Sequence, residues 1–243
     1  GMKRMGFRPA LWMTICSVIA LVILIALGSW QMYRMQWKAG LIAEFETRAH
    51  AAPQDVIDID VENPVRYQRV QVAGTWLHQH EVQLIGRTFE GTAGYHVITP
   101  LMLNDGRMVM INRGWVSQDY RMPDSRPFTL ISEPVTFEGI IRLQAQKGYF
   151  VPENNLEKND WFTLSISDIA RYRSLDDTLI TSFTVDALRG DGAHKLPIGA
   201  AVDIALPNNH LQYALTWYGL ALGLIGVYFA WHRSAGRLGR VKT

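Results

Sequence analysis

One histidine stands at the start of a long uncharged run, close to three aromatic residues. His210 precedes Tyr213, Trp217 and Tyr218, and no charged side chain occurs from Leu211 to Trp231. A neutral imidazole is a common metal ligand, and a polar group at a membrane is costly enough to indicate a function. Histidine and tyrosine are also ordinary anchors at membrane interfaces. Position alone therefore leaves a ligand and an anchor as open interpretations of His210.

Helical spacing collects these residues on one face. The positions that recur every three or four residues are His210, Tyr213 or Ala214, Trp217, and Leu220 or Ala221. The alternative to a binding face is that this stripe packs on another helix. Gly219 and Gly223 stand four apart toward a different side, and we expect them to allow a helix partner to approach closely.

Two uncharged runs, 11–30 and 211–231, lie near the two ends of the chain. At about 1.5 Å per residue, each can cross a hydrocarbon core of roughly 30 Å. The tails outside these runs carry seven of the 24 Lys and Arg residues and none of the 22 acidic residues. The positive-inside rule places both tails in the cytoplasm and the middle region outside the membrane. We predict tails at 1–10 and 232–243, spans at 11–32 and 209–231, and a periplasmic domain at 33–208.

A cleaved signal peptide is the alternative for the first run. Its apolar core is longer than the roughly 7–15 residues of a signal peptide. The aromatic and basic residues that follow form an interfacial belt typical of a retained anchor, namely Trp30, Tyr33, Arg34, Trp37 and Lys38. Few residues precede the run, so we expect no mitochondrial transit peptide and a bacterial inner membrane.

The middle region is predicted to be one α+β domain built mainly from antiparallel strands. Apolar and polar residues alternate over 70–76 and 135–143, which is typical of half-buried strands. A hairpin is expected at Asn104-Asp105-Gly106, and Ser167–Tyr172 predicts a short capped helix. We predict a mainly antiparallel sheet or partly open barrel with one or two short helices. Loops are expected around Pro123–Pro134 and Gly190–Gly199.

The middle region lacks the common catalytic signatures. It has no Gly-x-Ser-x-Gly elbow, no His-Glu-x-x-His and no phosphate-binding glycine loop. His78 and His80 are two apart on a predicted strand, but no Cys or acidic cluster accompanies them, so we expect an exposed edge. His96 is predicted to lie on a strand and His50 in a linker.

Composition excludes several exported functions. Cys16 is the single cysteine and lies in the first span, so copper relay by paired thiols, haem c attachment and disulfide exchange are excluded. Nucleic acid is not an expected partner, because the middle region is acidic on balance and has no basic stripe. A signalling receptor is disfavoured, since the tails are too short for an output domain.

Three separate segments carry a resemblance to one family. They are Gly-Ser-Trp-Gln-Met-Tyr-Arg-Met-Gln-Trp-Lys at 28–38, Val-Met-Ile-Asn-Arg-Gly-Trp-Val at 109–116, and Asn-His-Leu-Gln-Tyr-Ala-Leu-Thr-Trp-Tyr at 209–218. In this order, and with an anchor at each end, they resemble the surfeit-locus-one family of cytochrome c oxidase assembly factors.

The resemblance implies a chaperone rather than an enzyme. It implies help in placing haem a into subunit I of the oxidase, with subunit I, its assembly intermediates and the haem a synthesis machinery as partners. His210 occupies the position of the histidine proposed as haem ligand in bacterial members, and imidazole is a common axial ligand. Tyr213 and Trp217 would pack at the edge of the flat macrocycle.

Haem propionates would need cations near the membrane surface. Arg34, Lys38 and Arg113 are candidates, because arginine binds carboxylates well. Arg34 and Lys38 are equally explained as snorkelling anchors, and Arg113 as a residue that holds a turn. Two other classes stay open: a structural clamp on the oxidase that binds no haem, and a membrane-anchored exported enzyme.

Overall fold

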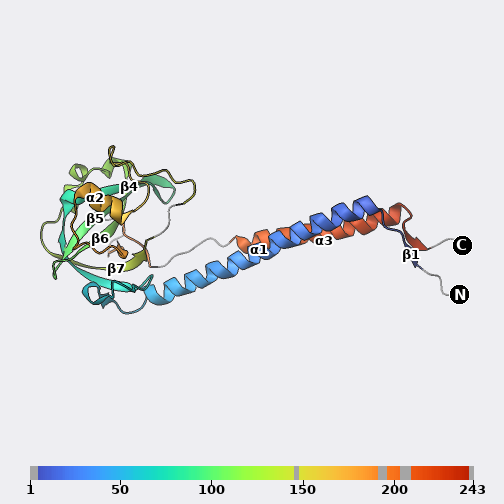
Figure 1. Cartoon of the computed structure of the whole chain (residues 1–243), viewed down its shortest axis with the longest axis horizontal. Coiled ribbons are helices and arrows are strands. Elements are labelled where there is room, and N and C mark those ends of the chain that lie inside the picture. Colours follow the sequence, from blue (N-terminus) through green and yellow to red (C-terminus); the bar gives the residue numbers. More distant parts are fainter. Residues whose placement is uncertain (1–4, 145–147, 191–195, 203–208, 241–243) are drawn as a thin grey trace. The chain divides into compact units, whose positions relative to one another are not determined.

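The structure is a computed structural model that describes residues 5–144, 148–190, 196–202 and 209–240 (Figure 1). The chain forms two compact units. Residues Gly1–Ala43 and Ala205–Thr243 make up the helical unit, and residues Glu44–Ile204 make up the β domain.

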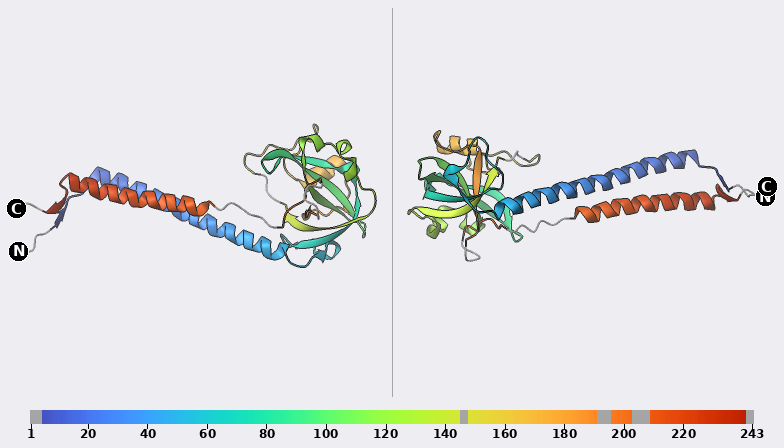
Figure 2. Two further views of the ribbon diagram at one scale, coloured as in Figure 1. Left: turned by 180° about the vertical axis from the view of Figure 1, so that it is seen from behind. Right: turned by 90° about the horizontal axis from the view of Figure 1, so that it is seen from below.

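Two long apolar helices dominate the helical unit. Helix α1 begins at Leu11 and is continuous to Ala49, and α3 runs from His210 to Ser234. Both are long and apolar enough to cross a membrane, which confirms the two long apolar helices expected near the ends of the chain. They lie side by side and antiparallel in each view (Figures 1 and 2). Most of their large apolar side chains point outward, as side chains that face lipid do.

Hydroxyl groups pair across the seam between the helices. The Thr14 Oγ1 lies 2.6 Å from the Tyr228 Oη, and the Ser29 Oγ lies 3.0 Å from the Tyr218 Oη. Because water is absent from a bilayer core, such groups need partners within the protein. These pairs therefore fix the antiparallel register of α1 and α3.

A two-stranded ribbon joins the tails. Strand β1 (Met5–Phe7) pairs antiparallel with β9 (Leu238–Arg240) beside a fully buried histidine, His232. The His232 Nδ1 donates to the Tyr228 carbonyl at 2.9 Å, and its Nε2 accepts from the Ala10 amide at 3.1 Å. Both ring nitrogens thus bind backbone, and His232 ties the ends of the two helices together. No sequence pattern marks His232 for this role.

The β domain contains a closed barrel. Its strands are β2 (Gln54–Asp55), β3 (Arg69–Trp76), β4 (Val82–Phe89), β5 (Thr92–Leu103), β6 (Met108–Ser117), β7 (Val135–Leu143) and β8 (Phe183–Ala187). The sheet order is β2-β3-β7-β8-β6-β5-β4, and β3 also pairs with β5. The ring β3-β7-β8-β6-β5 is therefore closed. Only the β2–β3 and β6–β8 pairs among these strands are parallel, so the predicted mainly antiparallel character is confirmed.

The barrel closes over an apolar core. Inward residues include Val70, Val72, Leu101, Ile111 and Ile141, each fully buried. The predicted strands at 70–76 and 135–143 are confirmed as β3 and β7, because their alternation matches the two faces of a sheet. The predicted hairpin is also confirmed between β5 and β6, where Gly106 has a φ of 87°.

A second apolar cluster lies under helix α2 (Ile166–Arg173). Trp161 and Ile169 are fully buried in it. The predicted short helix is confirmed, but its cap is Ser165, whose Oγ accepts from the Asp168 amide at 3.3 Å.

Short 3-10 turns occur in two of the segments that connect the strands. His78 and His80 lie in a 3-10 turn, His78–His80, so the strand predicted for them is wrong. Strands β3 and β4 both pair antiparallel with β5, Trp76 opposite Leu101 and Val82 opposite Ile98, so they run in the same direction. The turn interrupts the chain between them, and the His80 and Glu81 amides bond back to the Leu77 and His78 carbonyls. The Pro123–Pro134 loop contains two 3-10 turns, Pro123–Ser125 and Pro127–Thr129. Of the Gly190–Gly199 loop, residues 191–195 lie outside the described part of the chain.

Candidate functional site

His210 is the first residue of α3, and a residue of the first span contacts its ring. The His210 Nδ1 lies 2.7 Å from the Gln31 Oε1 of α1. An amide oxygen can only accept a hydrogen bond, so Nδ1 is the donor. In the neutral imidazole the lone pair is then on Nε2. At metal sites a ligating histidine usually donates from one ring nitrogen to a neighbour and binds the metal through the other.

The face of α3 below His210 packs on α1. Ala214 is fully buried and Ala221 is 5% exposed, which confirms helix packing for these two members of the predicted stripe. The Tyr218 ring lies so close to Gly28 that a Cβ there would be 2.6 Å from it. An added Cβ at Gly219 or Gly223 meets no described atom within 4 Å, so α1 does not approach them and their role toward another helix partner stays a prediction. The close approach occurs instead at Gly28, where an aromatic ring needs the space.

The aromatic candidates do not share one environment. Trp217 is half-buried and lies seven residues, or two turns, from His210. Tyr213 is 54% exposed. The structure therefore places Trp217 on the side of His210 and leaves the Tyr213 ring directed outward. Roles for either ring in holding a macrocycle stay predictions.

Arg34 lies on the same side of α1 as Gln31, since the two residues are three positions apart. Its guanidinium carbon is 4.6 Å from the centre of the Trp37 ring and 6.0 Å from that of Trp30. These cation–π contacts are those of an interfacial anchor. They also hold the positive charge of Arg34 within one turn of Gln31, which contacts His210. Binding of a propionate by Arg34 stays a prediction.

Arg113 belongs to the interior of the β domain. The register of β5 and β6 shifts there, because Val97 pairs with Gly114 and Ile98 pairs with Asn112, which leaves Arg113 without a partner on β5. Such a bulge redirects a side chain. The Arg113 guanidinium lies 4.4 Å from the Trp76 ring, and its Nη2 donates to the Thr129 carbonyl at 2.8 Å.

Burial dominates the electrostatics of Arg113. Arg113 is only 8% exposed. Burial lowers the pKa of its guanidinium to about 10, and the negative charge of Glu81 partly offsets this shift. Its contacts are those of a residue that holds the loop after β6, as the simpler interpretation of the sequence expects. Propionate binding by Arg113 stays a prediction.

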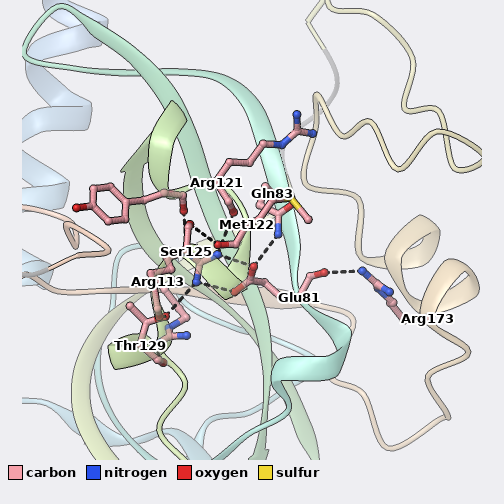
Figure 3. A network of polar contacts seen from close by, with 10 residues as sticks. Glu81, Gln83, Arg113, Arg121, Met122, Ser125, Thr129 and Arg173 are labelled. Carbon is pink, nitrogen blue, oxygen red and sulfur yellow. Dashed lines mark hydrogen bonds and ion pairs between the residues drawn. The ribbon is translucent and has the colours of Figure 1, made fainter.

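A buried ion pair organises the same loop (Figure 3). Arg126 is fully buried and donates to both oxygens of the Glu81 carboxylate, at 3.0 and 2.6 Å. Gln83 donates to the same carboxylate and Arg173 to the Glu81 carbonyl, each at 2.6 Å. No local sequence pattern marks this network, because Glu81 and Arg126 are 45 residues apart.

Asn112, the residue before Arg113, directs its side chain to His96 of β5. The Gly114 amide donates to the Asn112 Oδ1 at 3.0 Å, so the amide nitrogen faces the other way. That Nδ2 lies 3.1 Å from the His96 Nδ1 and must be the donor. The His96 Nδ1 is therefore the acceptor, and its proton is on Nε2. Within the Asn-Arg-Gly motif, Arg113 thus holds the loop after β6, and Asn112 fixes the tautomer of His96.

His96 lines a polar pocket of about 410 Å³ in the β domain. Arg66, Arg87, Arg142 and Asp186 also line it. Burial, and then the charge of Arg87, lowers the pKa of His96 to about 4, so its ring is neutral near pH 7. Burial raises the pKa of the Asp186 carboxyl, while its contact with the Arg142 Nε, at 2.9 Å, opposes that shift.

The three motif segments lie within the part of the chain that a model of a known family matches. The sequence model of the SURF1 family matches residues 18–222. The chain belongs to the SURF1 family. A SURF1-like protein of Monosiga brevicollis is 32% identical over 231 residues, which cover 88% of this chain and 85% of that protein. Surfeit locus protein 1 of Homo sapiens is 32% identical over 221 residues, covering 84% of this chain and 72% of the human protein.

The SURF1 match includes both sites described above. His210 and Gln31 lie within it in the helical unit, and His96 and Asn112 lie within it in the β domain. Among the described residues, no group of three or more His, Cys, Asp or Glu side chains is arranged to hold a metal ion.

Proposed function

We propose that this SURF1-family protein assists the assembly of cytochrome c oxidase by holding haem a at His210 for insertion into subunit I. Family membership supports the assembly role. The contact between Gln31 and His210 carries the haem proposal, because it places the lone pair of the imidazole on Nε2.

The residues around His210 suit this ligand. When bound, haem a supplies an iron that accepts an axial nitrogen. His210 would provide that nitrogen, and the half-buried Trp217 indole would pack beside the ring system. Arg34, within one turn of Gln31, would pair with a propionate at the membrane surface.

The charge distribution supports a location in a bacterial inner membrane with the β domain in the periplasm. Both tails are basic and free of acidic residues. Pairing of β1 with β9 keeps them at one end of the helical unit, as two tails in one compartment require.

Replacement of His210 tests the haem site. We expect the His210→Ala protein, purified in detergent, to lose most of the haem absorbance that the unmodified protein carries, at equal expression and membrane insertion. His232→Gln is the matched control on α3, because both nitrogens of His232 bind backbone. Equal haem content in the His210→Ala protein would exclude His210 as the ligand.

Deletion of the gene separates a chaperone from a structural clamp. A helper of insertion acts before turnover, so the deletion strain should contain subunit I of which a fraction lacks haem a. Oxidase activity should fall in proportion to that loss, with normal turnover per loaded enzyme. A clamp would instead remain with the mature oxidase at fixed stoichiometry, and fully loaded but inactive subunit I would contradict the chaperone.

A further inference from the structure

The pocket beside His96 contains more positive charge than its own residues neutralise. Three arginines, Arg66, Arg87 and Arg142, line it together with a single carboxylate, Asp186. Asp186 is already paired with Arg142. Arg66 lies 3.9 Å from Glu44, which makes a closer pair with Arg48.

Arg87 is the unusual member of this set. It is half-buried, and burial lowers its pKa. Its Nη1 donates to the Ile85 carbonyl at 3.1 Å and its Nη2 to the Phe162 carbonyl at 3.2 Å. No carboxylate of the described residues lies within 4.0 Å of it. Buried charges are usually paired, so this cation lacks the counter-ion that its position calls for.

His96 adds a fixed donor to the same wall. Asn112 occupies the Nδ1 lone pair of His96, so the pocket-lining ring carries its proton on Nε2. A neighbouring pocket of about 200 Å³ shares His96, Asn112 and Asp186 and adds Arg189. The two pockets together present guanidinium and imidazole N–H groups around one already neutralised carboxylate.

We propose that this pocket binds the carboxylate or phosphate group of a small molecule. An oxyanion accepts hydrogen bonds only, which matches a wall of N–H donors, and arginine binds planar and tetrahedral oxyanions well. The volume lies within the range of small-ligand sites, roughly 300–1,000 Å³. Arg87 supplies the uncompensated charge, His96 Nε2 a directed hydrogen bond, and the Asn112 bulge the positioning of His96. The pocket-lining residues named here belong to the β domain and do not include His210, and the test of the site does not depend on haem.

Calorimetric titration of the full chain in detergent, at fixed ionic strength, tests this site. Inorganic phosphate and succinate are the two probes, and they distinguish a phosphate from a carboxylate ligand. We expect saturable binding of at least one probe. Arg87→Gln should weaken the affinity for the probe by about tenfold or more, because it removes a charge. His96→Leu should weaken it by about tenfold, because it removes a directed hydrogen-bond donor. His96→Gln, which retains an N–H donor, should restore much of the affinity.

Arg171→Gln is the matched control, since Arg171 lies on α2, pairs with Asp168 and does not line the pocket. It should bind like the unmodified protein. Thermal unfolding of each variant without ligand shows whether it is folded, and should Arg87→Gln fail to fold, the two His96 variants decide. No saturable binding of either probe, unchanged affinity in the folded pocket variants, or an equal loss in Arg171→Gln would overturn the proposal.

Discussion

Gln31 connects the first of the three family-like motifs of this chain, at 28–38, to its candidate ligand. It occurs in the segment that ends the first span, yet its spacing alone gave it no function. Its contact with the His210 Nδ1 shows that a residue of one helix sets the tautomer of a residue on another. The candidate site is thus a pair of residues rather than a lone histidine.

Replacement of Gln31 should weaken haem retention without removing the ligand. We expect Gln31→Leu to lower haem affinity by about tenfold, since loss of the partner of a ligating histidine typically costs 10–100-fold. Haem per protein after purification, measured by absorbance, checks this. Ser29→Ala, which removes only the contact with Tyr218, should retain its haem. Unchanged retention in Gln31→Leu would show that the contact does not prepare His210.

His96 should make the β domain less stable in mild acid. Burial, and then the charge of Arg87, lowers the pKa of His96 from its usual 6.5 to about 4 in the folded domain. The unfolded chain therefore binds a proton that the folded domain does not, and stability falls as the pH drops from about 6.5 to about 4. The loss should reach about 2 kcal/mol between pH 7 and pH 5.

His96→Gln isolates this contribution, because the amide does not titrate. We expect its unfolding free energy to change by about 2 kcal/mol less than that of the unmodified protein between pH 7 and pH 5. Asp186 acts in the opposite direction, since a raised carboxyl pKa favours the folded state on acidification, but it is common to both proteins. Identical pH dependence of the two proteins would contradict the assignment of a depressed pKa to His96.

At the scale of elements, the seam between α1 and α3 depends on which residues are small. Gly28 accommodates the Tyr218 ring, while Ala214 and Ala221 are the buried small residues of α3.

In β6, the bulge at Asn112-Arg113-Gly114 separates neighbouring side chains, with Asn112 directed to His96 and Arg113 to Thr129. One short motif therefore serves two places in the β domain.

Enlarging Gly28 should destabilise the helical unit. A Cβ at this position would lie 2.6 Å from the Tyr218 ring, so Gly28→Ala must displace that ring. Overpacking of this kind costs about 1–3 kcal/mol. Thermal unfolding in detergent should show a lower midpoint, and Tyr218→Ala in the same chain should relieve the clash. Gly219→Ala is the control on the open side of α3, where we expect no loss of stability.

At the scale of the whole molecule, the distribution of charge predicts its orientation. The basic tails carry no acidic residue, and β1 pairs with β9, so both ends should remain in the cytoplasm. A reporter enzyme that works only in the periplasm should be active when inserted after Gly106, in the β5–β6 turn, and silent at either terminus. Periplasmic activity at the C-terminus would reverse the proposed topology.

The sequence by itself determined the features that depend on local pattern. Both long apolar helices, strands β3 and β7, the turn at Gly106 and helix α2 were predictable, because hydropathy, alternation and turn residues act over a few neighbouring positions. Expectations failed where a local pattern was compatible with two outcomes. His78 and His80 could continue a strand or form a turn, and the structure has a turn there.

Only the tertiary structure decided the contacts that give the candidate sites their chemistry. Gln31 and His210 are 179 residues apart, and Glu81 and Arg126 are 45 apart. Closure of the barrel by β3 and β5, and the bulge that turns Asn112 toward His96, likewise depend on pairing between distant segments. The tautomer of each histidine follows from a partner that folding brings to it, and this is why residue type and spacing named His210 but did not reveal the His96 pocket.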